Sequence, residues 1–560
     1  LGEWGGALMR CGAGGIQSGR VTLAGPAQRV PWLDIRRIAT FPGPRLHGTW
    51  FASLSLGGDP RGRRPQHTAS RNRRPQQARA QPSGGDPPLT PASAPAAVPM
   101  DSSTQPAPAT GGDPAEAPAD PELPRLTVTQ VEQMKVEARV ADIYRVLFGA
   151  APNTKSIMLE LWRDQHIEYL THGLRHLGPA FHVLDANRPW LCYWMVHPLT
   201  LLDEVLDDDL EDDIVDFLAR CQDKDGGYGG GPGQLPHLAT TYAAVNTLVT
   251  IGSERALSSI NRDNLYKFML RMKDESGAFR MHDGGEIDVR ASYTAISVAS
   301  LVNILDVELA KGVGDFIARC QTYEGGIAGE PYAEAHGGYT FCGLAALILL
   351  NEAEKLDLPS LIDWVAFRQG VECGFQGRTN KLVDGCYSFW QGAAIALTQK
   401  LVMIIDGQLK SLYCCKKPSE EDACGTSSSG CTSEKSSSAV DYAKFGFDFT
   451  QRSNQVGPLF HNIALQQYIL LCAQITTTSV KQVLEGGLRD KPGKNRDHYH
   501  SCYCLSGLSV SQYSAMIDSE SCPLPQHVLG PYSNLLEPIH PLYNVVLDKY
   551  HTAHEFFSKE

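Results

Sequence analysis

The sequence predicts an all-α fold in which helical hairpins of about 48 residues repeat and close into an α/α barrel, or toroid. Three observations predict this fold: a glycine-rich turn recurs at a nearly constant spacing, an amphipathic stretch precedes each turn, and an almost wholly apolar stretch follows it. Periods of 20–50 residues indicate a solenoid or another repeat array. Helices that are apolar all round are buried, so the inner stretches favour closure of the array into a barrel.

The repeated turn has a recognisable pattern in five places. The matching segments are C-Q-D-K-D-G-G-Y at 221–228, M-K-D-E-S-G-A-F at 272–279, C-Q-T-Y-E-G-G-I at 320–327, R-Q-G-V-E-C-G-F at 368–375 and K-Q-V-L-E-G-G-L at 481–488. One position is occupied in turn by Gln222, Lys273, Gln321, Gln369 and Gln482, at spacings of 51, 48, 48 and 113 residues. The last spacing indicates one repeat plus an insertion.

Each turn is expected to join an outer helix to an inner one. The preceding stretch D-I-V-D-F-L-A-R at 213–220 is apolar on one side only, as in a surface helix. The following stretches, such as Y-T-F-C-G-L-A-A-L-I-L-L at 339–350, are apolar all round and contain no proline. The acidic run D-D-L-E-D at 208–212 imitates a diphosphate-binding motif, but we interpret it as the solvated start of an outer helix.

Three parts of the chain differ from the repeats. Residues 1–99 form a low-complexity Arg/Gly/Pro-rich extension, which we expect to be upstream sequence because Met100 opens a plausible natural start. Residues 100–124 form a Pro/Ala-rich linker, and residues 125–560 form the barrel domain. Residues 406–455, rich in Ser, Cys, Lys and Glu, are predicted to be a disordered insertion in that domain.

Charge and cysteine content narrow the class of protein. The net charge is −12, but residues 1–100 carry +9, so the remainder carries −21 and argues against nucleic acid as the main ligand. No apolar run is long enough to predict a membrane span. The 15 cysteines are irregularly spaced, which favours reduced thiols and a cytoplasmic location.

The loops between the turns and the inner helices carry the polar chemistry. They hold His237, Arg290, His336, the Arg378–Cys386 stretch and the Asp490–His500 stretch. In a barrel these loops open at the same end. There the helix N-termini, with free N–H groups and partial positive charge, would attract a diphosphate.

The segment K-L-V-D-G-C-Y-S-F-W-Q at 381–391 allows several interpretations. Asp384 and Cys386 are a metal half-site, a nucleophile with a helper, or a helix cap followed by a packed cysteine. His500 holds the equivalent place in the last repeat, and Asp, Cys and His together would give zinc three ligands and an open fourth position. Nearby Cys502 and Cys504 are expected to pack in the core, and a second metal at Cys414, Cys415, Cys424 and Cys431 is the less favoured alternative.

From Leu126 to Lys549 the chain resembles the prenyltransferase β-subunit family, in the farnesyltransferase type found in plants, with an insertion. The resemblance rests on long stretches, which are R-P-W-L-C-Y-W, G-G-G-P-G-Q-L-P-H-L-A, G-G-E-I-D-V-R-A-S-Y, E-A-H-G-G-Y-T-F-C-G-L, G-R-T-N-K-L-V-D-G-C-Y-S-F-W-Q and D-K-P-G-K-N-R-D-H-Y-H-S-C-Y-C-L-S-G-L. The family's fold is an α/α barrel, in agreement with the repeats.

The resemblance implies transfer of a farnesyl group from farnesyl diphosphate to the cysteine thiol of a C-terminal C-a-a-X motif. It implies one Zn²⁺ on Asp384, Cys386 and His500, and Mg²⁺ near Asp490 with the diphosphate. The implied diphosphate ligands are His336, Arg378, Lys381 and Tyr387. The implied isoprenoid and peptide contacts are Trp190, Trp194, Tyr242, Arg290, Tyr293, Cys342, Trp390 and Tyr499. An α subunit is the implied partner, without which the chain is expected to be inactive.

The nearest alternative is the β subunit of the type I geranylgeranyltransferases. The bulky Trp190, the aromatic Tyr499 and the acid Asp490 each match the farnesyl type, whereas Thr240 stands where that type often has proline. More distant alternatives are a terpene cyclase, whose D-x-D-D or D-C-T-A acid motif does not occur, and a non-enzymatic toroid that only binds. The preferred last peptide residue is not predicted.

Overall fold

The computed structural model describes residues 126–414, 440–454, 456–474, 486–516 and 521–559, and these are mostly helical. The predicted extension at 1–99 and linker at 100–124 lie outside the described residues. So do Gln482 and the cysteines Cys415, Cys424 and Cys431.

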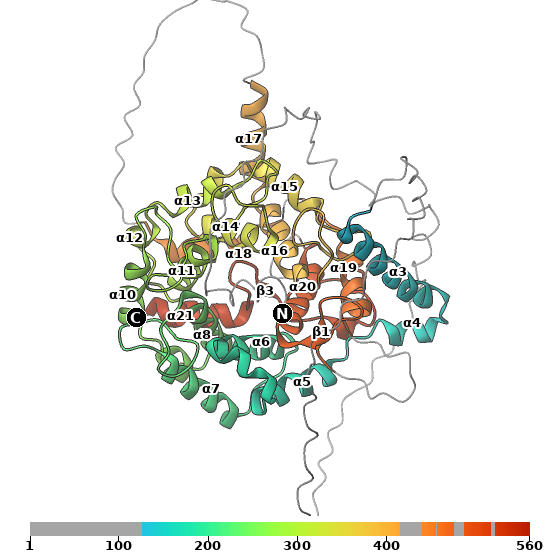
Figure 1. Ribbon diagram of the computed structural model, residues 1–560, viewed down its shortest axis with the longest axis horizontal. Helices are drawn as coiled ribbons and strands as arrows, with labels where there is room; N and C mark the ends of the chain where they lie inside the picture. Colours follow the sequence, from blue (N-terminus) through green and yellow to red (C-terminus); the bar gives the residue numbers. More distant parts are fainter. Residues whose placement is uncertain (1–125, 415–439, 455, 475–485, 517–520, 560) are drawn as a thin grey trace, which may run out of the picture. The chain divides into compact units, whose positions relative to one another are not determined.

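Six buried helices form an inner ring in the described part of the chain (Figure 1). Each packs against the next along the chain, and α20 packs against α6, so the ring is closed. Their nearly continuous apolar surface permits this, because each helix needs an apolar neighbour on both sides. The six are α6 (Arg188–Leu201), α8 (Leu238–Ile251), α11 (Val289–Leu301), α14 (Gly337–Leu349), α16 (Tyr387–Gln399) and α20 (His498–Tyr513). The predicted α/α barrel is confirmed.

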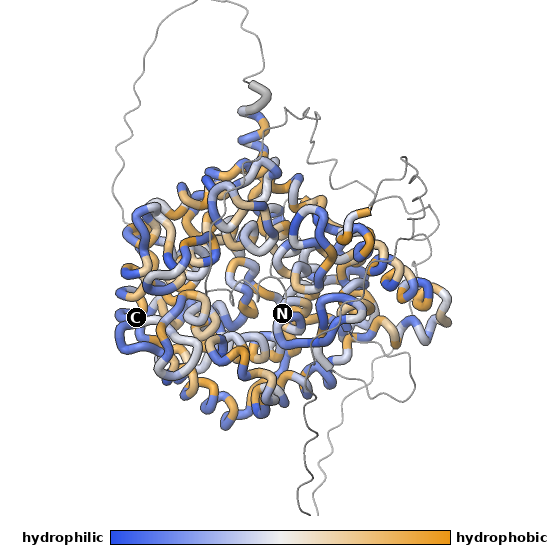
Figure 2. The backbone as a smooth tube through the Cα atoms, viewed as in Figure 1, coloured by the Kyte–Doolittle hydropathy of each residue, from blue (hydrophilic) through white to orange (hydrophobic). Residues whose placement is uncertain are grey.

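A second set of helices surrounds the ring, and Figure 2 shows hydrophilic and hydrophobic residues alternating along them. In α7, buried Leu210, Ile214 and Leu218 recur at helical spacing while the acids between them face outward. Asp207 caps this helix by accepting from Leu210 N at 3.0 Å, which confirms that the acidic run is a helix start. The outer helices are α5 (Arg163–Arg175), α7 (Asp208–Cys221), α10 (Arg262–Met272), α13 (Val313–Cys320), α15 (Leu358–Ala366) and α19 (Asn462–Tyr468).

The repeated glutamine forms a hydrogen bond between neighbouring hairpins, here called the clasp. Gln222 Oε1 accepts from the main-chain N of Asn261, the N-cap of the next outer helix, at 2.9 Å. Gln321 and Gln369 hold the next N-caps in the same manner, and Lys273 donates to a carbonyl of the following hairpin. The recurrence of one side chain every 48 or 51 residues therefore reflects one hydrogen bond made at each junction of the ring.

The last repeat differs from the sequence alignment. Gln474, not Gln482, takes the clasp position: it bridges to Leu488, and its Oε1 accepts from Trp162 N at 3.1 Å. Trp162 is the N-cap of α5, so this clasp joins the last hairpin to the first. Fourteen positions of sequence separate Gln474 from its bridge partner, against six for Gln222 in the first repeat. Because the sequence alignment assumed the shorter spacing, it assigned this position to Gln482.

The predicted boundaries of the disordered insertion, 406 and 455, were too far apart. Its two ends are helical in the described residues, as parts of α17 (Val402–Cys414) and α18 (Tyr442–Gln451). Phe449 is fully buried, and α18 packs on α11 and α14. The average composition of the segment concealed the aromatic stretch Y-A-K-F-G-F-D-F at 442–449. Residues 415–439 lie outside the described part.

A segment near the C-terminus fills the ring from the end where the inner helices finish. This segment, here called the plug, is residues 539–546, with strands β3 (Ile539–His540) and β4 (Val545–Val546). Its main-chain oxygens accept from inner-helix side chains: Tyr193 Oη to Asn544 O at 2.6 Å and Tyr242 Oη to Tyr543 O at 2.9 Å. Figure 1 shows β3 inside the ring. The plug therefore closes this end of the ring, and its main-chain oxygens are hydrogen-bonded to side chains of the inner helices.

The remaining elements are short or lie at the edges. No single described helix has the length and apolar character needed to span a membrane, and only α16 with α17 meets that test, across a 71° bend. The remaining elements are α3 (Val128–Gly149), α4 (Pro152–Met158), η1 (Pro179–Asn187), α9 (Glu254–Ser258), α12 (Val307–Ala310), η2 (Ala353–Lys355), η3 (Ile469–Ala473), β1 (Leu488–Arg489), β2 (Arg496–Asp497), η4 (Pro525–His527), η5 (Tyr532–Asn534) and α21 (Leu547–Lys559).

Candidate active site and metal centre

Three potential metal ligands meet where two inner helices begin. Asp384 precedes Cys386, the N-cap of α16, and His500 lies in the first turn of α20. One ligand atom from each residue lies within 4.8 Å of the other two. Cys386 and His500 are buried, and Asp384 is 9% exposed. The helix contact α16–α20 therefore brings together the residues that the repeat register had paired.

The loop before α16 is fixed by its main chain. Asp384 N donates to Phe375 O at 3.0 Å, and Gly385 N donates to Asp490 O at 2.8 Å. Asp384 Oδ1 also accepts from Cys386 N at 2.9 Å, which fixes the carboxylate just before the N-cap of α16. The helix-start interpretation is therefore confirmed, and the donors of the metal half-site interpretation lie in a cluster that could hold a metal ion.

His500 is oriented by an acid that the sequence analysis did not identify. Its Nδ1 lies 2.7 Å from Asp497 Oδ2, and its main-chain N donates to Asp497 Oδ1 at 2.8 Å. The opposite nitrogen, Nε2, is buried 3.2 Å from Asp384 Oδ1 without a hydrogen bond of good geometry. A carboxylate behind a metal-binding histidine is a common arrangement. An acid three residues before a histidine at a predicted helix start was the available signal.

The electrostatics of the cluster favour a cation. Burial alone would lower the pKa of His500, but the carboxylates of Asp384 and Asp497 raise it to about 10. Burial alone would raise the pKa of Asp384, but His500 pulls it below its usual range. Burial and the Asp384 charge raise the pKa of the Cys386 thiol. The cluster thus holds protons that a divalent cation would displace, and its buried N, O and S donors fit Zn²⁺.

A histidine and a tyrosine lie together close to this cluster. His336 caps α14 by accepting from Gly338 N at its Nδ1, at 3.1 Å. A neutral imidazole that accepts at Nδ1 carries its proton on Nε2, and Nε2 lies 3.0 Å from Tyr387 Oη. The Nε2–H group therefore donates to Tyr387 Oη and fixes the orientation of that hydroxyl.

The two basic residues of the predicted diphosphate site, Arg378 and Lys381, have different neighbours. Arg378 forms an ion pair with Glu334. Lys381 lines a separate cavity of about 660 Å³, together with Glu372 and Asn380 and with residues of α3. The structure therefore joins His336 to Tyr387 directly and keeps Arg378 and Lys381 on the neighbouring turn, where Lys381 N donates to Arg378 O at 3.3 Å.

Asp490 lies beside the metal cluster. Burial, together with the negative charge of Asp384, raises the pKa of Asp490 to about 6. Its carboxylate forms an ion pair with Lys491, and its main-chain oxygen accepts from Gly385. The D-K-P-G turn and the D-G-C turn are thus hydrogen-bonded to one another.

Aromatic side chains from all six inner helices form a closed belt inside the ring. Neighbouring ring centroids in it lie 4.6–5.7 Å apart. Trp390 Nε1 also donates to Tyr499 Oη at 3.3 Å. In order around the ring the belt comprises Trp190, Tyr242, Tyr293, Phe341, Trp390, Tyr503, Tyr499 and Trp194.

Two members of this aromatic belt were missed in the sequence. Phe341 lies five positions after the N-cap of its helix, the register that Tyr242 and Tyr293 also occupy in theirs. That register was the signal for Phe341. Tyr503 carried no comparable signal, because its place in the belt depends on how α20 meets α16.

Two residues predicted to line the isoprenoid wall adjoin the belt. Cys342 is fully buried next to Phe341, and its pKa is raised by burial. Arg290 lies about one turn before Tyr293, with its Nε 3.0 Å from Asp288 Oδ2 and its guanidinium 5.7 Å from the centre of the Tyr339 ring. Arg290 is thus nearer the polar loops than the other predicted wall residues.

The expectation of free N–H groups at the inner-helix starts was wrong for the first turns described. The first N–H groups donate to carbonyls of the next hairpin, and N-cap side chains accept from the groups that follow. These main-chain bonds are Leu238 N to Met281 O (2.8 Å), Val289 N to Gly329 O (2.9 Å) and Gly337 N to Gly377 O (2.7 Å). The main-chain N–H groups at these three helix starts are therefore already paired.

Residues 161–545 match the family model for the prenyltransferase alpha-alpha toroid domain. The chain is 58% identical over 454 residues to the protein farnesyltransferase subunit beta of Pisum sativum, covering 79% of this chain and 100% of that protein. It is 52% identical to the protein of the same description from Arabidopsis thaliana, covering 78% and 91%.

The geranylgeranyl type is a more distant relative. The geranylgeranyl transferase type-1 subunit beta of Arabidopsis thaliana is 32% identical over 273 residues, covering 42% of this chain and 72% of that protein. Within one organism, the relative of the farnesyl type thus matches a longer part of the chain at a higher identity.

Proposed function

We propose a reaction for this chain from the premise that it belongs to the prenyltransferase α/α-toroid family and, within it, to the protein farnesyltransferase β subunits. The reaction forms a thioether between the cysteine of a C-terminal C-a-a-X motif and C1 of farnesyl diphosphate. The observation that carries the proposal is the buried Asp384, Cys386 and His500 cluster next to a continuous aromatic belt.

Zinc is the metal that these ligands fit, one ion per chain. When bound, it supplies an open coordination position that lowers the pKa of a substrate thiol, so that the thiolate is present at neutral pH. The buried His500 Nε2, without a hydrogen bond of good geometry, supports this assignment. Asp497 holds the His500 ring so that its Nε2 lone pair points toward Asp384 and Cys386.

The leaving diphosphate is held by side-chain donors. The S–C1 bond forms as the C1–O bond breaks, and the electron pair leaves on the diphosphate oxygen. The Tyr387 O–H, oriented by His336 Nε2, would donate to that oxygen group, and Arg378 and Lys381 on the neighbouring turn would supply positive charge. Asp490 would hold Mg²⁺, and this ion would add positive charge beside the leaving diphosphate.

The farnesyl chain would lie along the aromatic belt. Its flat, apolar surface excludes water from the allylic carbon, which becomes electron-poor as the C1–O bond breaks. Trp190 and Tyr242 form the wall on one side, and Trp390 and Tyr293 on the other. The peptide's aliphatic residues would pack near Trp194 and Tyr499, whose ring centroids lie 5.4 Å apart.

The enzyme is proposed to act as a heterodimer with an α subunit, in the cytosol, on C-a-a-X proteins. The test is co-expression with a prenyltransferase α subunit and measurement of transfer from farnesyl and geranylgeranyl diphosphate to peptides ending in Ser, Met or Leu. Faster transfer of farnesyl is expected. Preferential transfer of geranylgeranyl would favour the type I geranylgeranyltransferase instead.

The dependence on a partner is tested with the chain alone. Purified without an α subunit, it is expected to bind zinc and to transfer no isoprenoid. Turnover by the isolated chain comparable to that of the heterodimer would refute the proposed dependence on a partner.

A further inference from the structure

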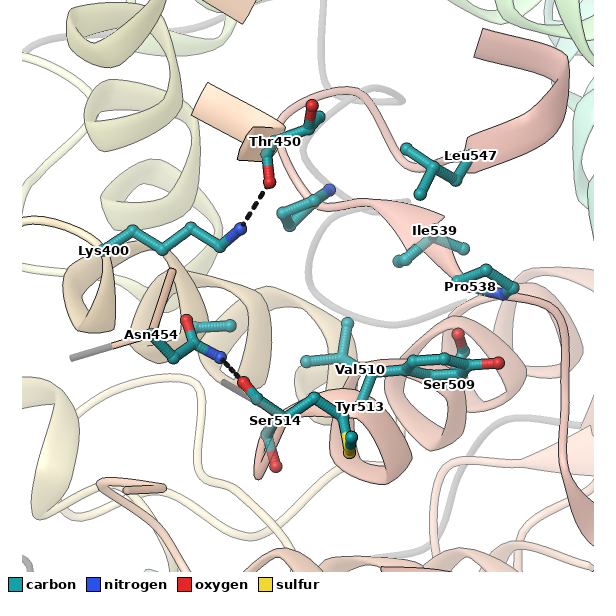
Figure 3. A pocket seen from close by; sticks show the side chains of 13 residues that line it. Lys400, Thr450, Asn454, Ser509, Val510, Tyr513, Ser514, Pro538, Ile539 and Leu547 are labelled. Carbon is teal, nitrogen blue, oxygen red and sulfur yellow. Dashed lines mark hydrogen bonds between the residues drawn. The ribbon is translucent and has the colours of Figure 1, made fainter. Parts of the chain in front are cut away.

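A small cavity lies where α16 and α20 end, away from the metal cluster at their starts. Figure 3 shows the side chains that line it. Its volume is about 100 Å³. Much of its wall is apolar and comes from four elements or their flanking residues, with Ala396 from α16, Val510 from α20, Ile539 from β3 and Leu547 from α21. Such a wall suits a hydrocarbon group and not a multiply charged one such as a diphosphate.

One wall of this cavity carries a largely buried cation. Lys400, the C-cap of α16, donates from Nζ to Thr450 O at 3.1 Å, and Nζ lies 5.8 Å from the centre of the Phe449 ring. Burial, helped by the charge of Arg452, lowers the pKa of Lys400 to about 8. No carboxylate in the described part of the chain lies within ion-pair distance of it. An ammonium has three donor hydrogens, so two remain for an anion.

A second polar side chain on the same wall has one atom without a hydrogen bond. Asn454 Nδ2 donates to Met516 O at 2.7 Å, which fixes the orientation of the amide, while Asn454 Oδ1 is buried without a hydrogen bond. Buried polar atoms without partners are rare and call for an explanation. A ligand with a donor group would satisfy Oδ1, and an anionic group would satisfy Lys400.

We propose that this cavity is a binding site for a small amphiphilic carboxylate, with its carboxylate on Lys400 and its hydrocarbon part against Val510 and Ile539. Since a cavity of about 150 Å³ holds benzene, one of about 100 Å³ holds a ligand of about four to six non-hydrogen atoms. The unpaired Asn454 Oδ1 further favours a carboxylate that also carries a hydroxyl group. A water molecule could pair with Asn454 but would not neutralise Lys400.

The site is independent of the proposed prenyl transfer. It joins the far ends of the two helices whose starts carry Cys386 and His500. Occupancy is therefore expected to stabilise the folded barrel, because a ligand that binds only the folded state raises its stability. It is not expected to compete with an isoprenoid diphosphate.

The first test uses the unaltered heterodimer and three probes: propanoate, its 2-hydroxy derivative and the neutral propanamide. Dissociation constants come from ligand-observed NMR titrations. The carboxylate is expected to bind about tenfold more tightly than the amide, because hydrogen bonds to charged groups are the stronger class. The hydroxy acid is expected to bind more tightly still. Equal affinity of acid and amide, or displacement of the acid by farnesyl diphosphate, would overturn the proposal.

The second test changes the lysine. Lys400→Met keeps the length of the side chain and removes its charge, so binding of the acid should weaken about tenfold while binding of the amide stays the same. Lys410→Met is the matched control on an exposed residue of α17 and should change neither. Undiminished binding of the acid to a folded Lys400→Met protein would overturn the assignment.

Discussion

The two ends of the inner helices differ in how their polar groups are satisfied. Where α16 and α20 start, Asp384, Cys386 and His500 converge, and His500 Nε2 is buried without a hydrogen bond. Toward the other end, Tyr193 and Tyr242 donate to main-chain oxygens of the plug. The side chains at the starts of α16 and α20 could thus bind a ligand, whereas many polar side chains at the plug end are already hydrogen-bonded within the protein and stabilise the fold. Among the described residues there are exceptions: Asn246 Oδ1 and Asn544 Nδ2 near the plug, and Asn454 Oδ1 at the cavity, are each buried without a hydrogen bond.

The largest expected effect comes from removing a metal ligand. Cys386→Ala should lose bound zinc and lower turnover by at least about a thousandfold, equivalent to about 4 kcal/mol, while the barrel stays folded. Metal content and transfer rate are measured on the same sample. Cys504→Ala is the matched control: this cysteine is also buried beside the loop but is outside the cluster. Full zinc content in Cys386→Ala would contradict the site.

The belt lies between the two ends and should govern the choice of isoprenoid. Trp190→Thr removes a large wall residue, so the kcat/KM ratio for geranylgeranyl over farnesyl diphosphate should rise about 10- to 200-fold, the range for small changes in an apolar pocket. Competition between the two diphosphates measures this ratio. Tyr193→Phe changes the same helix at a residue bonded to the plug and should leave the ratio unchanged. An unchanged ratio in Trp190→Thr would separate the belt from isoprenoid binding.

Asp497 tests the orientation of His500. Asp497→Asn keeps a side chain that caps α20 but removes the carboxylate from His500 Nδ1, so zinc affinity should fall about 10- to 100-fold. Titration against a zinc chelator measures the affinity, and a thermal melt checks the cap. If zinc affinity is retained while the melting temperature falls, Asp497 acts only as a helix cap.

At the plug end the expected change is in stability. Asn246 Nδ2 donates to Tyr543 O at 2.9 Å within the core, so Asn246→Ala should lower the free energy of unfolding by about 1–3 kcal/mol. Denaturant unfolding measures it, and kcat per folded molecule should not change. A loss of kcat without a loss of stability would break the division between the two ends.

The smallest effect concerns pH. Burial lowers the pKa of His197 from 6.5 to about 3, although Asn544 opposes this. Below pH 6.5 His197 therefore binds a proton in the unfolded state but not in the folded state, so the free energy of unfolding falls as the pH drops. The cost for this residue between pH 6.5 and 5.5 is about 1 kcal/mol. His197→Gln should flatten the dependence of unfolding free energy on pH by that amount, and an unchanged slope would show that His197 is protonated when folded.

The sequence by itself determined the repeat and the two kinds of helix, and it indicated that Asp384, Cys386 and His500 lie at the same end of the barrel, whereas their role as metal ligands was implied by the family resemblance. Each rests on a local pattern: a period near 48 residues, one-sided or continuous apolar character, and matching loops at helix starts. The α/α barrel was confirmed, and so was the proximity of Asp384, Cys386 and His500.

Only the tertiary structure decided which groups at these positions meet. Gln474 occupies the clasp position that the sequence alignment had assigned to Gln482. Asp497 forms a hydrogen bond to His500, and Phe341 and Tyr503 belong to the aromatic belt. The plug and the cavity at Lys400 also depend on residues far apart in the chain. The physical reason is that periodicity specifies which face of a helix is buried, whereas pairing of polar groups across helices depends on ring closure and on turn lengths that differ between repeats.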